Sequence, residues 1–335
     1  MDTSNSRHIR AGVLGGGGLC IAICIVVFVS LTLTASAGPS MQEEGSAANL
    51  SSAGQEVNPR IAGMITEVSE SELSATTADL QAFGTRVVRT DGNAEAAAYL
   101  HDRLRAVPGL AVEYQGGDLR NVVATLPGSG PGADTFVVVG AHYDSTSSDP
   151  ENAPGATDNA AGVAIVLELA RIMSNQTFDR TVQFALWNAE ETDRSGSRDY
   201  ARQAAADDRE ILFYFNYDSA CLDPEGRSML DIMYDERSAP VADLMHRHNT
   251  LYGINLTLTE NNYTCISDHV PFREAGYPAV MTHQEGHGSG HTPDDTVDHM
   301  SLPFTRKNAQ LGMSVIAEVA GVQENGTGTP ESVRQ

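Results

Sequence analysis

The chain has 335 residues, enough for one large globular domain with additional segments, and its 41% hydrophobic content is typical of a protein with a buried core. It carries 21 basic and 44 acidic residues, a formal net charge of −23. This excess of negative charge argues against nucleic acids and anionic lipids as partners, because their phosphates would be repelled. A high-salt habitat and a skewed genome composition explain the charge equally well.

The N-terminus has the pattern of an export signal. Two arginines within the first ten residues precede a stretch without charged residues, 11–42, and its most apolar part is 19–33. Residues 35–37 (ASA) then match a small-x-small cleavage site. The apolar stretch is also long enough to cross a bilayer, so an uncleaved anchor is the alternative. We therefore expect residues 1–37 to be a signal peptide or an N-terminal membrane anchor, and the rest to be exported, either secreted or held on the outer face of the cell membrane.

Two of the four cysteines, Cys221 and Cys265, lie outside this N-terminal stretch. An even pair in an exported domain favours a disulfide bond between them. Two separate buried thiols are the alternative reading of the same pair.

Residues 38–60 are small, polar and without hydrophobic periodicity, which predicts a flexible linker. Residues 323–335 have the same character and predict a disordered tail. The region between them, 61–322, alternates helical and strand patterns and is expected to fold as one domain. In chain order, we predict helices at 70–84 and 93–107, strands at 111–114, 121–126 and 136–140, a helix at 160–173, a strand at 181–187, a helix at 197–206, strands at 211–217 and 230–234, a helix at 240–251, a strand at 279–282 and a helix at 303–319.

The run Phe136–Gly140 is continuously apolar, as in a strand that is buried on both faces. Strands that alternate with helices predict an α/β fold with a largely parallel sheet. The expected architecture is a three-layer αβα sandwich with a mostly parallel central mixed sheet.

Polar residues with metal-binding chemistry follow several of the predicted strands. In open α/β sheets, ligands bind at the carboxyl ends of the strands. Imidazole and carboxylate groups are good zinc ligands, so these residues together predict a metal site. They are His142 and Asp144 after the first buried strand, Asp158 in the loop before the next helix, Glu190 and Glu191 after 181–187, Asp218 after 211–217, and His291 after the last strand.

Several segments, in this order, resemble those of the co-catalytic zinc aminopeptidases related to bacterial leucyl aminopeptidase and yeast aminopeptidase Y. Glutamate carboxypeptidase II and glutaminyl cyclase are wider relatives of this zinc exopeptidase type. Each segment alone is a weak signal, but all of them in order are specific. The segments are GTR (84–86), RNVVATLPG (120–128), AHYDS (141–145), GATDNAAG (155–162), NAEE (188–191), SDHVPF (267–272) and HTPDDT (291–296).

The resemblance implies two zinc ions per chain. It implies that His142 and Glu191 bind one ion, that Asp218 and His291 bind the other, and that Asp158 bridges both. Three protein groups for each metal leave a position for water or substrate.

The resemblance also implies a catalytic role for Glu190 as the general base. It would take a proton from the metal-bridging water and pass it to the leaving amine. For Glu190 and Glu191 both to reach the site, the strand must already have ended, because successive strand side chains face opposite ways. Asp144 is implied to orient His142, and the bond after Asp158 is implied to be cis. The implied activity is hydrolysis of N-terminal residues from peptides with a free amino terminus.

Other polar residues near these motifs are expected to have lesser roles. Asp268 and His269 are expected to support or pack beside the site, and Tyr263 is a weaker candidate for donating to the developing oxyanion. His283 and His287 share a four-residue spacing with the predicted ligand His291, but the intervening glycines argue against a helix. We therefore expect them in a loop.

Two other functions compete with the hydrolase. A glutaminyl-peptide cyclotransferase would use a single zinc, but such enzymes tend to have Ser-Ala-Val after the residue that corresponds to Asp158, where this chain has Asn159-Ala160-Ala161. A metal-free binding protein on the same fold should lack ligands, whereas all the ligand positions are filled here. The residue types do not determine the preferred N-terminal side chain, the native metal or the oligomeric state.

Overall fold

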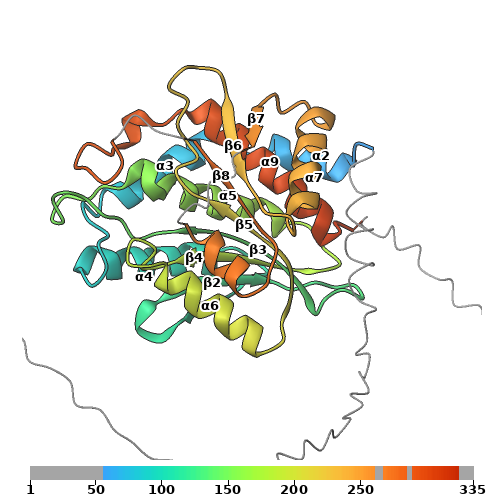
Figure 1. Ribbon diagram of the computed structural model, residues 1–335, viewed down its shortest axis with the longest axis horizontal. Coiled ribbons are helices and arrows are strands. Elements are labelled where there is room, and N and C mark those ends of the chain that lie inside the picture. Colours follow the sequence, from blue (N-terminus) through green and yellow to red (C-terminus); the bar gives the residue numbers. More distant parts are fainter. Residues whose placement is uncertain (1–55, 261–266, 285–288, 324–335) are drawn as a thin grey trace, which may run out of the picture. The chain divides into compact units, whose positions relative to one another are not determined.

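The predicted apolar run forms the central strand of the sheet in a computed structural model that describes residues 56–260, 267–284 and 289–323. Within these residues, the sheet has eight strands in the order β1-β2-β4-β3-β5-β8-β6-β7 (Figure 1). The strands are β1 (Ala111–Gln115), β2 (Asn121–Leu126), β3 (Thr135–His142), β4 (Thr181–Trp187), β5 (Glu210–Tyr217), β6 (Met229–Met233), β7 (Thr257–Glu260) and β8 (Ala279–His283).

The four strands at the centre of the sheet, β4, β3, β5 and β8, run parallel to one another. Antiparallel pairing adds β2 and then β1 on one side and β6 on the other, and β7 pairs parallel with β6 at the edge. Because the central strands are parallel, their carboxyl ends meet at one edge of the sheet, where the loops that follow them gather.

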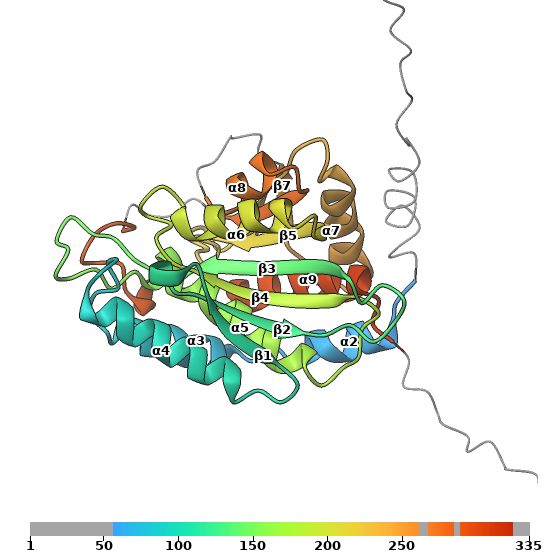
Figure 2. The same ribbon diagram turned by 90° about the horizontal axis from the view of Figure 1, so that it is seen from below.

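Helices cover both faces of the sheet, as Figure 2 shows. Helices α6 and α8 cover one face; α5 and α9 pack on the other, joined there by α2, α3 and α4. Both faces of β3 are therefore buried, which explains its continuous apolar sequence. The helices are α2 (Pro59–Thr66), α3 (Glu70–Gln81), α4 (Asp91–Arg105), α5 (Ala161–Met173), α6 (Ser195–Ala206), α7 (Ala239–Leu251), α8 (His269–Glu274) and α9 (Leu302–Ala320), with short turns η1 (Gly117–Leu119), η2 (Ala156–Ala160) and η3 (Val297–His299).

The predicted three-layer fold is confirmed, and the long predicted helices and strands all form within a few residues of their expected ends. One boundary differs, because α2 begins at Pro59 inside the segment predicted as linker. The Asn58 side chain caps this helix by accepting a hydrogen bond from the Arg60 amide. Strand β7 and helices α2 and α8 are not among the predicted elements. At four to eight residues, they are too short for a clear hydrophobic period.

Two expectations about the chain's context concern residues outside the described ranges. One is the signal peptide or membrane anchor expected at residues 1–37. Among the described residues, no helix is long and apolar enough to span a membrane. Cys221 is fully buried beside Ala161 and Leu222 and has no disulfide partner among the described residues. Cys265, its expected partner, lies outside them, so the disulfide bond stays a prediction.

Candidate metal centre

The ends of three of the four central strands, β3, β4 and β5, bring several predicted site residues to one place. His142 is the last residue of β3, and Asp218 directly follows β5. Strand β4 ends at Trp187, and Ala189 then adopts a left-handed conformation with φ of 61°. This turn satisfies the condition that the strand ends before the adjacent pair Glu190 and Glu191.

Asp158 comes from the short turn η2, which begins after Gly155. Gly155 has φ of 50°, and a Cβ there would lie 2.6 Å from the Ser145 Cβ and 2.7 Å from the Asp158 carbonyl oxygen, so only glycine fits. The Asp158–Asn159 peptide bond is cis, as the resemblance implied. The side-chain amide of Asn159 (Nδ2) then donates to the backbone oxygen of Tyr217, which connects this turn to the end of β5.

The donor atoms form groups that share Asp158. Its Oδ1 lies 3.2 Å from Nε2 of His142, which is 3.6 Å from Oδ1 of Asp218. Its Oδ2 lies 3.1 Å from Nε2 of His291, which is 3.2 Å from Oε2 of Glu191. In each group, one atom from every residue lies within 4.8 Å of the others, and a third such group joins His142 to Glu190 and Glu191.

This geometry corrects the expected pairing of the ligands. His142 is grouped with Asp218, and Glu191 with His291, whereas the resemblance implies that His142 pairs with Glu191 and Asp218 with His291. The position shared by Asp158 agrees with the expectation. The loop that follows β8 is responsible, because it places His291 beside Glu191 instead of beside Asp218.

Asp295 holds that loop in place, a role that the sequence did not reveal. Its buried carboxylate accepts hydrogen bonds from the Thr157 amide at 2.9 Å, the Thr157 hydroxyl at 2.5 Å and the Asp158 amide at 3.1 Å. The Ala156 amide also donates to the Asp295 backbone oxygen. Asp295 therefore ties the loop carrying His291 to the turn carrying Asp158. Its place in the HTPDDT segment was the only sequence signal for it.

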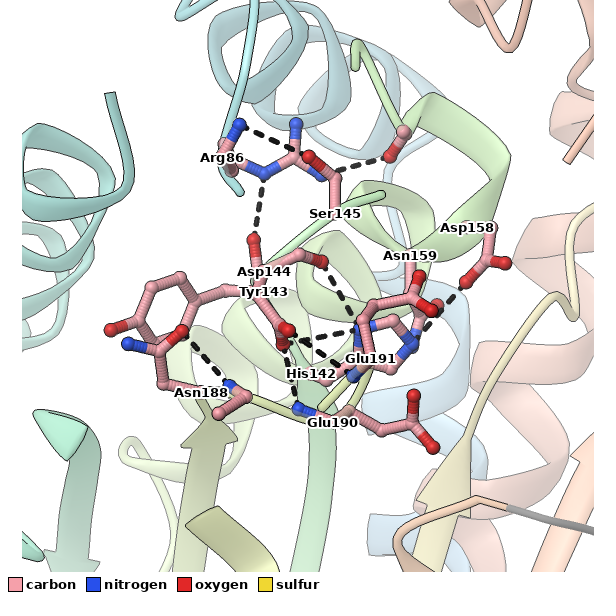
Figure 3. Close-up of polar contacts among 12 residues, drawn as sticks. Arg86, His142, Tyr143, Asp144, Ser145, Asp158, Asn159, Asn188, Glu190 and Glu191 are labelled. Carbon is pink, nitrogen blue, oxygen red and sulfur yellow. Dashed lines mark hydrogen bonds and ion pairs between the residues drawn. The ribbon is translucent and has the colours of Figure 1, made fainter. Parts of the chain in front are cut away.

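Asp144 acts mainly on the two glutamates. Its carboxylate accepts hydrogen bonds from the backbone amides of Glu190 and Glu191, at 3.1 and 3.2 Å. The Nδ1 atom of His142 lies 3.1 Å from the Asp144 backbone oxygen and 3.6 Å from its carboxylate. In Figure 3, His142 lies between Asp144 and Asp158. The expectation that Asp144 orients His142 thus holds largely through the main chain, while its carboxylate fixes the glutamate turn.

Arg86 is a second residue whose role only the structure reveals. Its guanidinium is fully buried and donates to the backbone oxygens of Leu80, Tyr143, Pro154 and Gly155. Figure 3 shows its contacts with Tyr143 and Ser145. Arg86 thus connects the segment after β3 to the segment that leads into η2, and both carry site residues. Burial lowers its pKa to about 10, and nearby carboxylates, Asp144 first, oppose that shift.

The site brings several carboxylates close together, and their negative charge favours the binding of cations. Burial raises the pKa of Glu190 well above its usual range, because a carboxylate loses hydration there. Burial works against His142, but Asp218 and neighbouring carboxylates raise its pKa well above the usual value. Asp158 and Glu191 raise the pKa of His291 to about 10. The carboxylates that raise the pKa of these imidazoles would also attract divalent cations, which bind imidazole in its neutral form.

The residues at the site fit divalent metal ions. Two imidazoles and three carboxylates offer nitrogen and oxygen donors, and Oε1 of Glu191 is buried without a hydrogen-bond partner among the described residues. The side chain of His291 is 57% exposed, so solvent reaches the site from its side.

The remaining predicted residues divide into two sets. Asp268 and His269 are fully buried at the start of α8 and belong to none of the donor groups among the described residues, so their supporting or packing roles stay a prediction. His283 ends β8 instead of lying in a loop, and its Nδ1 lies 3.2 Å from the Asp218 backbone oxygen. Tyr263 and His287 lie outside the described residues.

Comparisons with known proteins show which proteins the chain is similar to. Residues 121–316 match the family model described as peptidase family M28. The chain is similar to leucine aminopeptidase 1 of Aspergillus niger, with 28% identity over 80% of this chain and 74% of the relative. A zinc aminopeptidase from Bacillus subtilis is 26% identical, with a TM-score of 0.52 over 61% of this chain and 53% of that one. The LapA aminopeptidase of Legionella pneumophila shares the fold, with a TM-score of 0.71 at 17% identity over 80% of this chain and 76% of that one.

Proposed function

The chain belongs to peptidase family M28, and on that premise we propose that it is a zinc-dependent aminopeptidase that binds two metal ions. The observation that carries the proposal is the carboxylate of Asp158, which is shared between two groups of donors with Glu190 beside them. The similarity to proteins named leucine aminopeptidase and zinc aminopeptidase supports both the activity and the metal.

The positions of the site residues suggest which metal ion each of them would bind. His142 and Asp218 would hold one metal ion, Glu191 and His291 the other, and Asp158 both. When bound, such ions lower the pKa of water and polarise the scissile carbonyl.

Glu190 would act as the general base. Its amide is held by Asp144, and its carboxyl lies beside His142 and Glu191 without serving the two groups that share Asp158. A bound cation favours the ionised form of this buried carboxyl, which can then accept a proton from the attacking water and deliver it to the leaving amine. The substrate in this proposal is a peptide with a free amino terminus, whose ammonium group suits a site rich in carboxylates.

The test measures metal content and turnover together. We expect about two zinc ions per chain and chelator-sensitive release of leucine from Leu-p-nitroanilide. Glu190→Gln should keep the metal and lose about 100- to 10,000-fold in kcat. The matched control is Glu95→Gln, at an exposed position on α4, which should behave as wild type.

Three outcomes would contradict the proposal. Equal cleavage of the N-acetylated substrate would remove the requirement for a free amino terminus. One zinc ion with cyclisation of N-terminal glutamine would indicate a glutaminyl-peptide cyclotransferase. Absence of metal from the wild type would indicate a binding protein.

Export of the protein is part of the same proposal. The apolar stretch 19–33 and the small residues 35–37 support it. N-terminal sequencing of the protein from its native cells should find that residues 1–37 have been removed, or should find them intact on a membrane-bound enzyme. A full-length enzyme in the cytoplasm would contradict export.

A further inference from the structure

A series of four hydrogen bonds leads from the core of the protein to Asp218. Trp187 Nε1 donates to Tyr214 Oη at 2.8 Å, and Tyr214 Oη donates to Asn216 Oδ1 at 2.7 Å. Asn216 Nδ2 then donates to Ser267 Oγ at 2.8 Å, and Ser267 Oγ donates to Asp218 Oδ2 at 2.5 Å. All five residues are at least nine-tenths buried. We call these five residues the Trp187 relay.

The direction of the relay is determined at its inner end. An indole N–H can only donate, so the Tyr214 hydroxyl accepts from Trp187 and gives its own proton to Asn216. Burial raises the pKa of Tyr214 well above its usual range, which keeps that proton in place. If the Asn216 amide were reversed, the Tyr214 proton would lose its acceptor, and a buried donor without an acceptor is destabilising. The amide nitrogen therefore faces Ser267, whose proton is left for Asp218.

A glycine in the central strand makes the relay possible. Strand β3 separates β4, which carries Trp187, from β5, which carries Tyr214. Their side chains meet over Gly140, where a Cβ would lie 2.8 Å from Trp187 Nε1 and 3.0 Å from Tyr214 Oη. The ring of Phe272 stacks on that of Tyr214 at 4.0 Å and holds it against the sheet. The relay therefore depends on packing across three strands and helix α8.

We propose that the Trp187 relay positions Asp218 as a metal ligand. Because Ser267 donates to Oδ2, that oxygen is occupied, and the carboxylate presents Oδ1 to the ion that it would share with His142. Oδ1 lies 3.6 Å from Nε2 of His142, and among the described residues it accepts a longer bond, at 3.2 Å, from the Ser219 hydroxyl. The inference rests on the proposed metal site, and it adds that residues in the core help to set the affinity of that site.

The experiment compares two neighbouring tyrosines of β5. Tyr214→Phe removes a hydroxyl that belongs to the relay. Tyr217→Phe removes an equally buried hydroxyl that has no hydrogen-bond partner among the described residues, so it is the matched control. Ser267→Ala removes the last donor of the relay. For each full-length protein we would measure zinc affinity by competition with a chromophoric chelator, the visible absorption spectrum of the cobalt-loaded protein, and the melting temperature.

We expect the loss of zinc affinity to follow the order of the relay. Ser267→Ala should lower the affinity for one of the two zinc ions by about 10- to 100-fold and change the spectrum of the cobalt-loaded protein. Tyr214→Phe should lower the affinity for the same zinc ion by about 3- to 10-fold, and Tyr217→Phe should leave the affinity for both ions unchanged. In a protein that already carries Ser267→Ala, Tyr214→Phe should cause no further loss, because its effect passes through Ser267.

A merely structural role for Tyr214 predicts a different pattern. Tyr214→Phe would then lower the melting temperature without changing zinc affinity, or would reduce that affinity equally with and without Ser267. Either result overturns the relay while leaving the proposed function intact. A wild-type protein that binds no zinc would instead contradict the proposed function, so the two failures are distinguishable.

Discussion

Asp295 offers a direct test of how the two halves of the metal centre are joined. Its carboxylate accepts three hydrogen bonds from Thr157 and Asp158, and its own segment carries His291. Replacement of Asp295 should therefore disturb two predicted metal ligands, Asp158 and His291, although Asp295 is not itself a predicted ligand.

The contacts give the size of the effect. Asp295→Ala leaves three donors without an acceptor, at about 1–3 kcal/mol each, so the free energy of unfolding should fall by roughly 3–9 kcal/mol. Asp295→Asn keeps the oxygen that serves Thr157 and places an amide opposite the Asp158 N–H, so its cost should be only about 1–3 kcal/mol. Because Asp158 belongs to both donor groups, both zinc ions should bind about 10- to 100-fold more weakly in the alanine variant.

The assays are urea unfolding of the metal-free protein and zinc binding by chelator competition. The control is Asp294→Asn, which removes the same charge from the exposed neighbouring residue and should change stability by less than about 0.5 kcal/mol. If Asp295→Asn and Asp294→Asn were indistinguishable in both assays, the role of Asp295 in joining the loop to the turn would be refuted.

Two further predictions concern the core. Gly140→Ala places a Cβ in the central strand 2.7 Å from the Ala185 backbone oxygen and should lower the free energy of unfolding by about 1–3 kcal/mol. In the control Gly63→Ala, the new Cβ has nothing within 4 Å, so the change should be neutral or stabilising. Equal effects of the two variants in urea unfolding would refute the tight packing at Gly140. Burial lowers the pKa of His248 to about 4, so the unfolded chain binds a proton near pH 6.5 that the folded protein excludes. Stability should therefore fall as the pH drops from 6.5 towards 4, by roughly 2–3 kcal/mol at pH 4.5, and His248→Gln should remove this part of the pH dependence; an unchanged pH profile in the variant would contradict the assignment.

The composition of the candidate site was predictable from sequence because its residues directly follow apolar strands. His142, Asp218 and the pair Glu190 and Glu191 each come after a run that is long and apolar enough to be recognised as a buried strand. Parallel strands bring their carboxyl ends to one edge, so adjacency in the fold follows from the chain pattern alone. The order of the familiar segments then identified which polar residues belonged to the site.

The grouping of those residues was not predictable, because it depends on where a loop lies. His291 joins Glu191 because Asp295 holds its loop against the turn of Asp158, a contact between residues more than 130 positions apart. The roles of Arg86 and of the Trp187 relay were hidden for the same reason. Their hydrogen bonds cross several elements, and no local period records them.

The sequence by itself determined the class of fold, the edge of the sheet at which the chemistry gathers, and the kinds of donor found there. These follow from hydrophobic periodicity and from the chemistry of single side chains, both of which are local properties. Tertiary structure alone decided which donors lie together, which oxygen of Asp218 accepts from Ser267, and how core side chains connect to that oxygen. Those features depend on distances of a few ångströms between segments far apart in the chain, and only the packed fold sets such distances.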